Sequence, residues 1–233
     1  GVGSLNVMTR RQVAIASVAA VAMLTTALLA GCSHLVTGTA QWPGSRLERA
    51  VLDEGDFAPG VRYQRIIRDR GEADGADAPP PMLSSPKGCT DGLTRDIAST
   101  AERGAGSAAE YVVAYDGARM VISVLSWQLN LEQLAATAER CAEFETFFEP
   151  SDPGIPMTTT RLPSPRGDAL VYQQTMRLGG EETSVYFSFE NVGSMAVFAI
   201  AFPTPDPSVP VKGTLPQTFL EITGKQAARA EAA

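Results

Sequence analysis

Three segments near the C-terminal end of the chain alternate apolar and polar residues and are separated by glycine-containing turns. They span residues 169–178, 183–190 and 195–202. A turn at Gly179-Gly180 sets one strand register, in which Tyr172 pairs with Phe187. A turn around Val192-Gly193 sets a second register, in which Phe187 pairs with Phe198. Both registers place the same apolar set on one face, which predicts an antiparallel meander with a buried side: Leu170, Tyr172, Val185, Phe187, Phe189, Phe198 and Ile200.

A further hairpin is predicted over residues 110–127, with its turn at Asp116-Gly117. This dipeptide tolerates the positive φ angles of a type I′ turn. The resulting register pairs Tyr115 with Ala118 and Tyr111 with Ile122. The hairpin therefore has a single apolar face, formed by Tyr111, Val113, Tyr115, Met120 and Ile122.

Helices are predicted before, between and after these hairpins along the chain. The strongest begins at Asn130, a capping residue supported by Gln133, and its apolar spacing of three and four residues runs to Pro150. Shorter helices are expected at 45–52 and after Thr90, and a first strand at 61–67. A closing helix begins after Thr214, is weakened at Gly224 and gives way to a frayed tail at 227–233. The chain is thus expected to form one α+β domain, residues 42–226, with helices packed over one face of an antiparallel sheet.

The N-terminal segment carries the features of a bacterial lipoprotein signal peptide. Arg10 and Arg11 precede an apolar run from Val13 to Ala30, which ends in the lipobox Leu29-Ala30-Gly31-Cys32. The alternative, a membrane-spanning helix, is less well matched because the run is rich in alanine and interrupted by hydroxyl side chains. We expect residues 1–31 to be a signal peptide, Cys32 to be lipidated and 32–41 to be a tether. The arginine pair leaves both general and twin-arginine export open.

The remaining cysteines, Cys89 and Cys141, predict one disulfide in an oxidising compartment outside the cytoplasm. Metal ligation is not expected, because no CxxC spacing occurs, the acidic run at 69–77 lacks the spacing of a calcium loop, and the only histidine is His34. No cofactor is expected either. Once the signal peptide is removed, 17 basic and 26 acidic side chains leave a net charge of −9. Such a domain is not expected to bind nucleic acid.

The arrangement of these motifs resembles a known group of proteins. The chain resembles mycobacterial cell-envelope lipoproteins of the sensor-domain-like group. The resemblance lies in the order of four features: the lipobox, Pro86-Lys87-Gly88-Cys89 before a helix, the hairpin at 111–127 and Ala138-Glu139-Arg140-Cys141. That group resembles the extracellular domain of a mycobacterial receptor serine/threonine kinase. The resemblance implies a cysteine-tied sheet and helices that frame a ligand-binding cleft. This chain departs from the kinase domain in lacking the cysteines for its further disulfide.

These observations favour a non-catalytic domain, anchored to the outer face of the cell membrane through Cys32, that binds or senses a small molecule or another envelope protein. An alternative is a carrier of lipid or another apolar molecule. An enzyme is not expected, because the domain contains no histidine for a Ser-His-Asp or Cys-His arrangement. In the carrier, four aromatic residues would line the cavity: Tyr172, Phe187, Phe189 and Phe198.

Overall fold

A computed structural model describes residues 44–67, 82–97, 106–204, 206 and 208–233, all within one unit that spans Trp42–Ala233. Its strands form a single antiparallel sheet with the order β1-β3-β4-β9-β8-β7-β6-β5-β2. The strands are β1 (Arg62–Ile66), β2 (Leu83–Ser85), β3 (Ala108–Tyr115), β4 (Ala118–Leu125), β5 (Glu143–Phe147), β6 (Ile155–Leu162), β7 (Leu170–Leu178), β8 (Glu181–Val192) and β9 (Met195–Pro203). The predicted α+β class, with an antiparallel sheet and one disulfide, is therefore confirmed.

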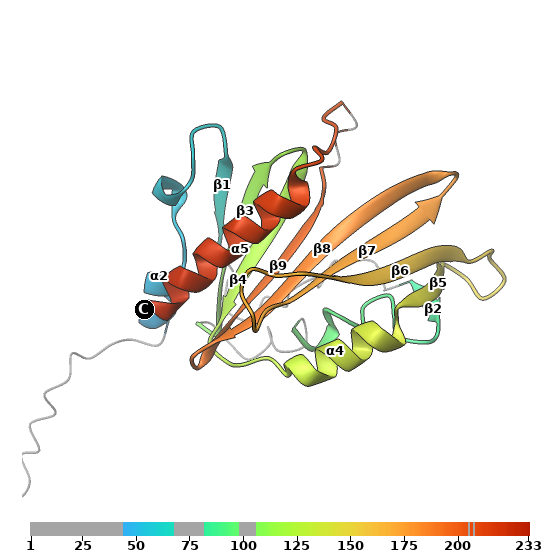
Figure 1. The fold of residues 1–233 in the computed structure, drawn as a ribbon, viewed down its shortest axis with the longest axis horizontal. Coiled ribbons are helices and arrows are strands. Elements are labelled where there is room, and N and C mark those ends of the chain that lie inside the picture. The colour runs from blue at the N-terminus through green and yellow to red at the C-terminus, as the bar shows by residue number, and fades with distance from the viewer. Residues whose placement is uncertain (1–43, 68–81, 98–105, 205, 207) are drawn as a thin grey trace, which may run out of the picture. The chain divides into compact units, whose positions relative to one another are not determined.

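Helices cover both faces of the sheet (Figure 1). They are α2 (Ser45–Ala50), the 3₁₀ turn η1 (Glu54–Asp56), α4 (Leu131–Arg140) and α5 (Leu215–Glu231). Helices α2 and α5 pack on one face against the central strands, whereas α4 packs on the other face against β6 and β7. The prediction that the helices pack over one face is therefore wrong for α4, which forms a second helical layer on the opposite face.

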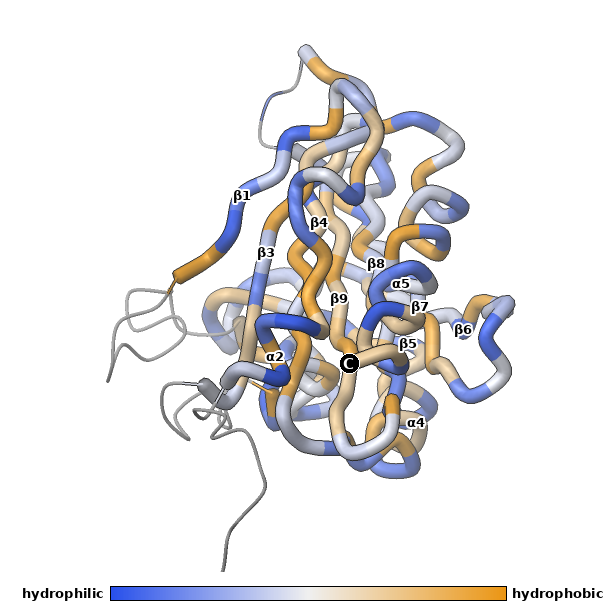
Figure 2. Tube along the Cα trace, turned by 90° about the vertical axis from the view of Figure 1, so that its left-hand side faces the viewer, coloured by the Kyte–Doolittle hydropathy of each residue, from blue (hydrophilic) through white to orange (hydrophobic). Residues whose placement is uncertain are grey.

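Strand β9 shows why both faces can be covered. Its side chains alternate between two hydrophobic clusters: Val197 and Ala199 lie in the cluster beneath α2 and α5, and Phe198 lies in the cluster beneath α4. Successive side chains of a strand point to opposite faces, so an almost continuously apolar strand can bury both. Figure 2 shows that β4 and β9 are hydrophobic along most of their length, whereas the edge strand β1 is mostly hydrophilic.

Two of the three predicted hairpin registers are confirmed. Tyr111 pairs with Ile122 across β3 and β4, and Tyr172 pairs with Phe187 across β7 and β8. In the first turn Asp116 and Gly117 have φ angles of 55° and 74°, as a type I′ turn requires. Tyr115 ends β3 and remains 40% exposed.

The predicted β8–β9 register is wrong by two residues. Phe187 pairs with Ile200 rather than Phe198, and Val192 pairs with Met195 across a turn at Gly193-Ser194. The side chain of Val192 is buried in the cluster beneath α5, so β8 keeps this residue and the turn moves one position along the chain. A shift of two residues preserves the face of every side chain, which is why the predicted buried set survives.

The predicted extent of α4 is also wrong. The helix begins as expected, with the Gln133 amide donating to Asn130 Oδ1 at 3.0 Å, but it ends at Arg140. The next residues form β5, in which Phe144 and Thr146 are buried. β5 pairs with β2 and β6, and these partners, distant in sequence, override the local helical spacing.

Helix α5 continues beyond its predicted end. Instead of fraying at 227–233, it extends to Glu231, and Ala227 and Ala230 are 0% and 2% exposed. The fully buried Gln226 donates to the carbonyl of Ala50 at 2.6 Å and accepts from the amide of Leu52 at 3.1 Å. These contacts fasten the end of α5 to α2 and explain why Gly224 does not terminate the helix.

Two tyrosines in the cluster beneath α2 and α5 differ in their hydrogen bonding. The rings of Tyr63 and Tyr111 stack with centroids 5.3 Å apart. The Tyr63 hydroxyl donates to the carbonyl of Leu52 at 2.9 Å. The Tyr111 hydroxyl is buried without a hydrogen-bond partner among the described residues. Burial raises the pKa of Tyr111, so this hydroxyl remains protonated at neutral pH.

We therefore expect opposite effects from two matched substitutions. Tyr63→Phe loses a hydrogen bond and should lower the free energy of unfolding by about 1 kcal/mol. Tyr111→Phe removes an unsatisfied buried hydroxyl and should leave stability unchanged or raise it by about 1 kcal/mol. Urea denaturation of both variants measures the difference. Equal losses in the two variants would mean that the Tyr111 hydroxyl has a partner.

Candidate functional site

A pocket of about 320 Å³ lies between α4 and the strands β6 and β7. Its size falls at the lower end of the range of about 300–1,000 Å³ that is usual for small-molecule sites. Helix α4 supplies one wall and the sheet supplies the other. The lining residues are Ala135, Ala138, Glu139, Ala142, Thr159, Arg161 and Tyr172.

The helical wall follows from the sequence of α4 and the residue after its C-cap. Ala135, Ala138, Glu139 and Ala142 are spaced by three or four positions, so they fall on one side of the helical turns. Three of the four carry only a methyl group, which leaves space between the helix and the sheet. Ala138 is buried, whereas Ala135 is partly exposed and Ala142 is exposed, so Ala138 is the innermost of the three small side chains.

The sheet wall follows from the β6–β7 register. Arg161 pairs directly with Tyr172, and Thr159 pairs with Gln174, so all four side chains lie on the same face of the sheet. Gln174 Nε2 donates to Thr159 Oγ1 at 3.3 Å. The Thr159 hydroxyl proton therefore remains available for another acceptor.

The pocket combines neutral hydroxyls with one cation and one anion. Burial raises the pKa of Tyr172, a rise that the positive charge of Arg161 opposes and the negative charge of Glu139 reinforces. The Tyr172 hydroxyl therefore stays protonated at neutral pH and can donate or accept a hydrogen bond. Arg161 and Glu139 are both exposed at the mouth. This arrangement can bind a polar molecule, because it offers hydrogen-bonding hydroxyls and two opposite charges.

The four aromatic residues expected to line a cavity have different locations. Tyr172 lines the pocket, whereas Phe187, Phe189 and Phe198 do not. The three phenylalanines are 0–7% exposed, and Phe189 stacks on both of the others, with ring centroids 6.4 Å and 5.3 Å apart. They form part of the hydrophobic core beneath α4.

Sequence reasoning missed the other residues of the pocket. The apolar spacing of α4 predicts ordinary helix packing for Ala135 and Ala138 and does not indicate a pocket beside them. Arg161 and Thr159 lie in β6, a strand that was not predicted from the sequence. The sequence feature that could have indicated the pocket is the set of small alanine side chains on the inner face of an otherwise well-formed amphipathic helix.

The predicted disulfide between Cys89 and Cys141 is present, with an S–S distance of 2.13 Å and the Cα atoms 5.5 Å apart. Cys141 follows α4 directly and precedes Ala142 of the pocket. The disulfide therefore fixes the C-terminal end of α4, and with it one end of the pocket, to the segment that contains Cys89.

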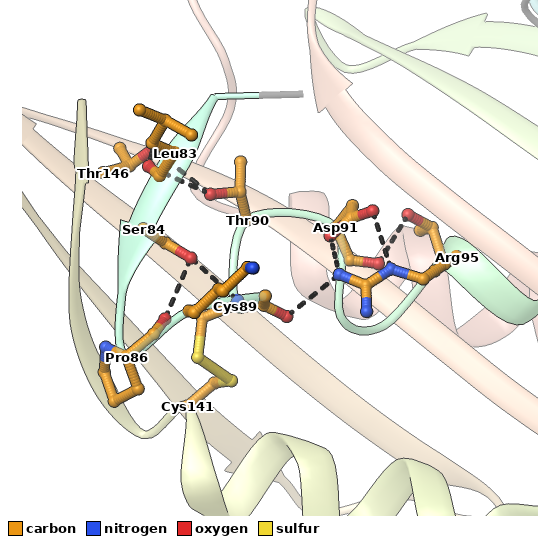
Figure 3. A network of polar contacts seen from close by, with 12 residues as sticks. Leu83, Ser84, Pro86, Cys89, Thr90, Asp91, Arg95, Cys141 and Thr146 are labelled. Atoms are coloured by element: carbon orange, nitrogen blue, oxygen red, sulfur yellow. Dashed lines mark hydrogen bonds and ion pairs between the residues drawn. A yellow bond between two sulfur atoms is a disulfide. The ribbon is translucent and has the colours of Figure 1, made fainter. Parts of the chain in front are cut away.

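Polar contacts order the segment around Cys89 (Figure 3). The Cys89 amide donates to Ser84 Oγ at 2.9 Å, and Ser84 Oγ donates to the carbonyl of Pro86 at 2.9 Å. Arg95 forms an ion pair with Asp91. The hydrogen bond from Arg95 is the main reason that the pKa of Asp91 is lowered. The segment around Cys89, to which the disulfide joins the end of α4, is thus held in place by its own hydrogen bonds.

Other predicted sites receive no structural description. Cys32 and the segments 1–31 and 32–41 lie outside the described residues. Within the described part of the chain, no three histidine, cysteine or acidic side chains are grouped as metal ligands. In the same part, none of the helices has the length and hydrophobicity needed to span a membrane.

Comparison with known proteins shows a weak structural similarity and no family. The chain matches no protein-family model, and no curated protein matches it. Among solved structures, an uncharacterised protein of Mycobacterium smegmatis, the Rv0999 ortholog, is similar over 80% of this chain and 95% of its own, with 13% identity and a TM-score of 0.47. A proposal for the function therefore starts from the pocket and its chemistry.

Proposed function

We propose that this protein is a non-catalytic binding domain of the cell envelope, anchored by lipid at Cys32, whose pocket between α4 and β6–β7 takes a small, partly polar molecule. The observation that carries the proposal is the pocket itself: an alanine-lined cavity of about 320 Å³ with the hydroxyls of Thr159 and Tyr172 inside and opposite charges at its mouth. Its lining combines alanine methyl groups with a similar share of polar surface, so the pocket suits a molecule that is polar as well as apolar.

The lining favours a polar ligand over an acyl chain. A lipid carrier needs an extended apolar cavity, but the phenylalanines that would form it are packed against one another in the core. Charged and hydroxyl groups around a lipid chain would lose their hydration without gaining partners. The resemblance of the sequence to envelope lipoproteins of the sensor-domain-like group also supports a binding or sensing role.

Filling the pocket should abolish binding. In Ala135→Leu the larger side chain occupies the mouth, whereas in Ala136→Leu it points to solvent on the exposed side of α4. We expect members of a small-molecule fragment library to shift amide NMR signals of 135–142 and 159–161 in the wild-type protein and in Ala136→Leu, but not in Ala135→Leu. Shifts elsewhere only, or unchanged shifts in Ala135→Leu, would contradict the proposed site.

The anchor is tested separately. We expect radiolabelled palmitate to be incorporated into the wild-type protein in a bacterial host and to be absent from Cys32→Ala, because only the lipobox cysteine supplies the thiol for lipidation. Cys89 and Cys141 are joined in the disulfide and provide no alternative acceptor. Continued labelling of Cys32→Ala would overturn the lipoprotein assignment.

A further inference from the structure

The two charged side chains of the pocket approach it from different walls. Arg161 extends from β6, where it is directly opposite Tyr172 of β7, and Glu139 extends from the last turn of α4. Figure 1 shows α4 running beside this part of the sheet. Both side chains line the pocket, and their charges act on the Tyr172 hydroxyl in opposite senses, so both can act on a bound molecule.

In the described part of the chain, Arg161 and Glu139 do not form an ion pair with each other. Among the described residues no ion pair joins Arg161 to Glu139, and neither forms an ion pair with another described side chain. A guanidinium and a carboxylate that face one pocket without pairing are complementary to a molecule that carries both charges. A simple anion would meet repulsion from Glu139, and a simple cation would meet repulsion from Arg161.

We propose that the ligand is a zwitterion, a free amino acid or a short peptide, whose carboxylate binds Arg161 and whose ammonium group binds Glu139. The inference rests on the proposed function and specifies its ligand class. The planar guanidinium suits a carboxylate through two parallel hydrogen bonds.

The rest of the pocket suits the middle of such a molecule. Thr159 Oγ1 accepts from Gln174, so its own proton is free to donate to a peptide carbonyl. The protonated Tyr172 hydroxyl offers a second hydrogen bond. The methyl groups of Ala138 and Ala142 leave room for small side chains.

The test uses three probes with the full chain in detergent micelles: alanyl-alanine, its N-acetyl form without the ammonium group, and its C-terminal amide without the carboxylate. Calorimetry or NMR titration measures each affinity. For the wild-type protein we expect each blocked probe to bind about fivefold more weakly than alanyl-alanine, since each has lost one solvent-exposed ion pair.

Two variants assign the charges. Arg161→Gln should bind alanyl-alanine and its amide equally while still preferring the free amine, and Glu139→Gln should show the converse. Glu221→Gln, on the exposed side of α5 at the other face of the sheet, should behave as wild type. This pattern supports the zwitterion and its orientation, because a general loss of structure would weaken all three probes together.

Other results would overturn the inference in distinguishable ways. Equal binding of the three probes to the wild-type protein, or preferences that neither variant changes, would overturn the zwitterion. Binding of fragments to the pocket without binding of alanyl-alanine would also overturn the zwitterion, but it would still support the pocket as a small-molecule site. If neither the fragments nor alanyl-alanine shift the signals of 135–142, the proposed function fails as well.

Discussion

Replacing Cys89 and Cys141 together by alanine is expected to lower the free energy of unfolding by up to about 4 kcal/mol. The disulfide spans a sequence separation of 52, and breaking it returns that loop's conformational freedom to the unfolded chain. Both cysteines are buried, at 1% and 2% exposure, and pack with Phe144. The expected loss of stability of up to about 4 kcal/mol includes the loss of these sulfur contacts. Urea denaturation under oxidising conditions measures it.

The reductant provides the control. Dithiothreitol should lower the stability of the wild-type protein towards that of the double variant and should leave the variant unchanged. Because Cys141 holds the end of α4 beside Ala142, reduction should also broaden the amide NMR signals of the pocket. A variant within about 0.5 kcal/mol of wild type, as a neutral surface change would be, would contradict a stabilising role.

Asp116→Asn is expected to lower the free energy of unfolding by about 2 kcal/mol at pH 7, because hydrogen bonds to a charged group are lost. The Asp116 carboxylate is nearly buried and accepts from Thr218 Oγ1 at 2.6 Å, from Thr214 Oγ1 at 3.1 Å and from Lys212 Nζ at 3.1 Å. Asparagine tolerates the positive φ angle of this turn position. The substitution therefore tests the carboxylate rather than the turn.

The effect should depend on pH. The hydrogen bond from Thr218, together with those from Lys212 and Thr214, lowers the pKa of Asp116 despite its burial. A carboxylate whose pKa is lower in the folded state than its unfolded value of about 3.9 contributes stability above that value and loses it as the pH falls through the folded pKa. Wild type and Asp116→Asn should thus differ fully at pH 7 and converge in strong acid.

Lys212→Met separates the ion pair from the threonine bonds. Lys212 is mostly exposed, so its loss should cost less than about 1 kcal/mol. A loss as large as that of Asp116→Asn would mean that the lysine, not the threonines, dominates. A difference between wild type and Asp116→Asn that persists unchanged in strong acid would contradict the role of the charged carboxylate.

Local chemistry decided which parts of the fold could be predicted. Asp116-Gly117 and Gly179-Gly180 each form a two-residue turn, and a two-residue turn fixes the register of the strands that it joins. Both registers were predicted correctly. The disulfide followed from counting cysteines outside the lipobox. The β8–β9 turn was misplaced because burial of Val192, a tertiary contact, chose between two neighbouring positions.

Long-range contacts account for the remaining errors. The end of α4 depends on the pairing of β5 with β2 and β6, and the end of α5 depends on the bonds from Gln226 to α2. The pocket was missed for a similar reason. An alanine on the inner face of a helix is equally compatible with close packing and with a cavity, and only the distance to the facing strands decides between them.

The sheet order also bears on how the chain can be assembled. Strand β9 lies between β4 and β8, and among the strands of the described residues it joins the ladder β1-β3-β4 to the five strands on its other side. The last helix, α5, contacts β4, β8 and β9 and so covers this junction. A nascent chain that has not yet delivered residues 195–231 therefore has two separate half-sheets with open edges. Such edges are prone to non-native pairing, so the continuous sheet can form only once β9 has been synthesised.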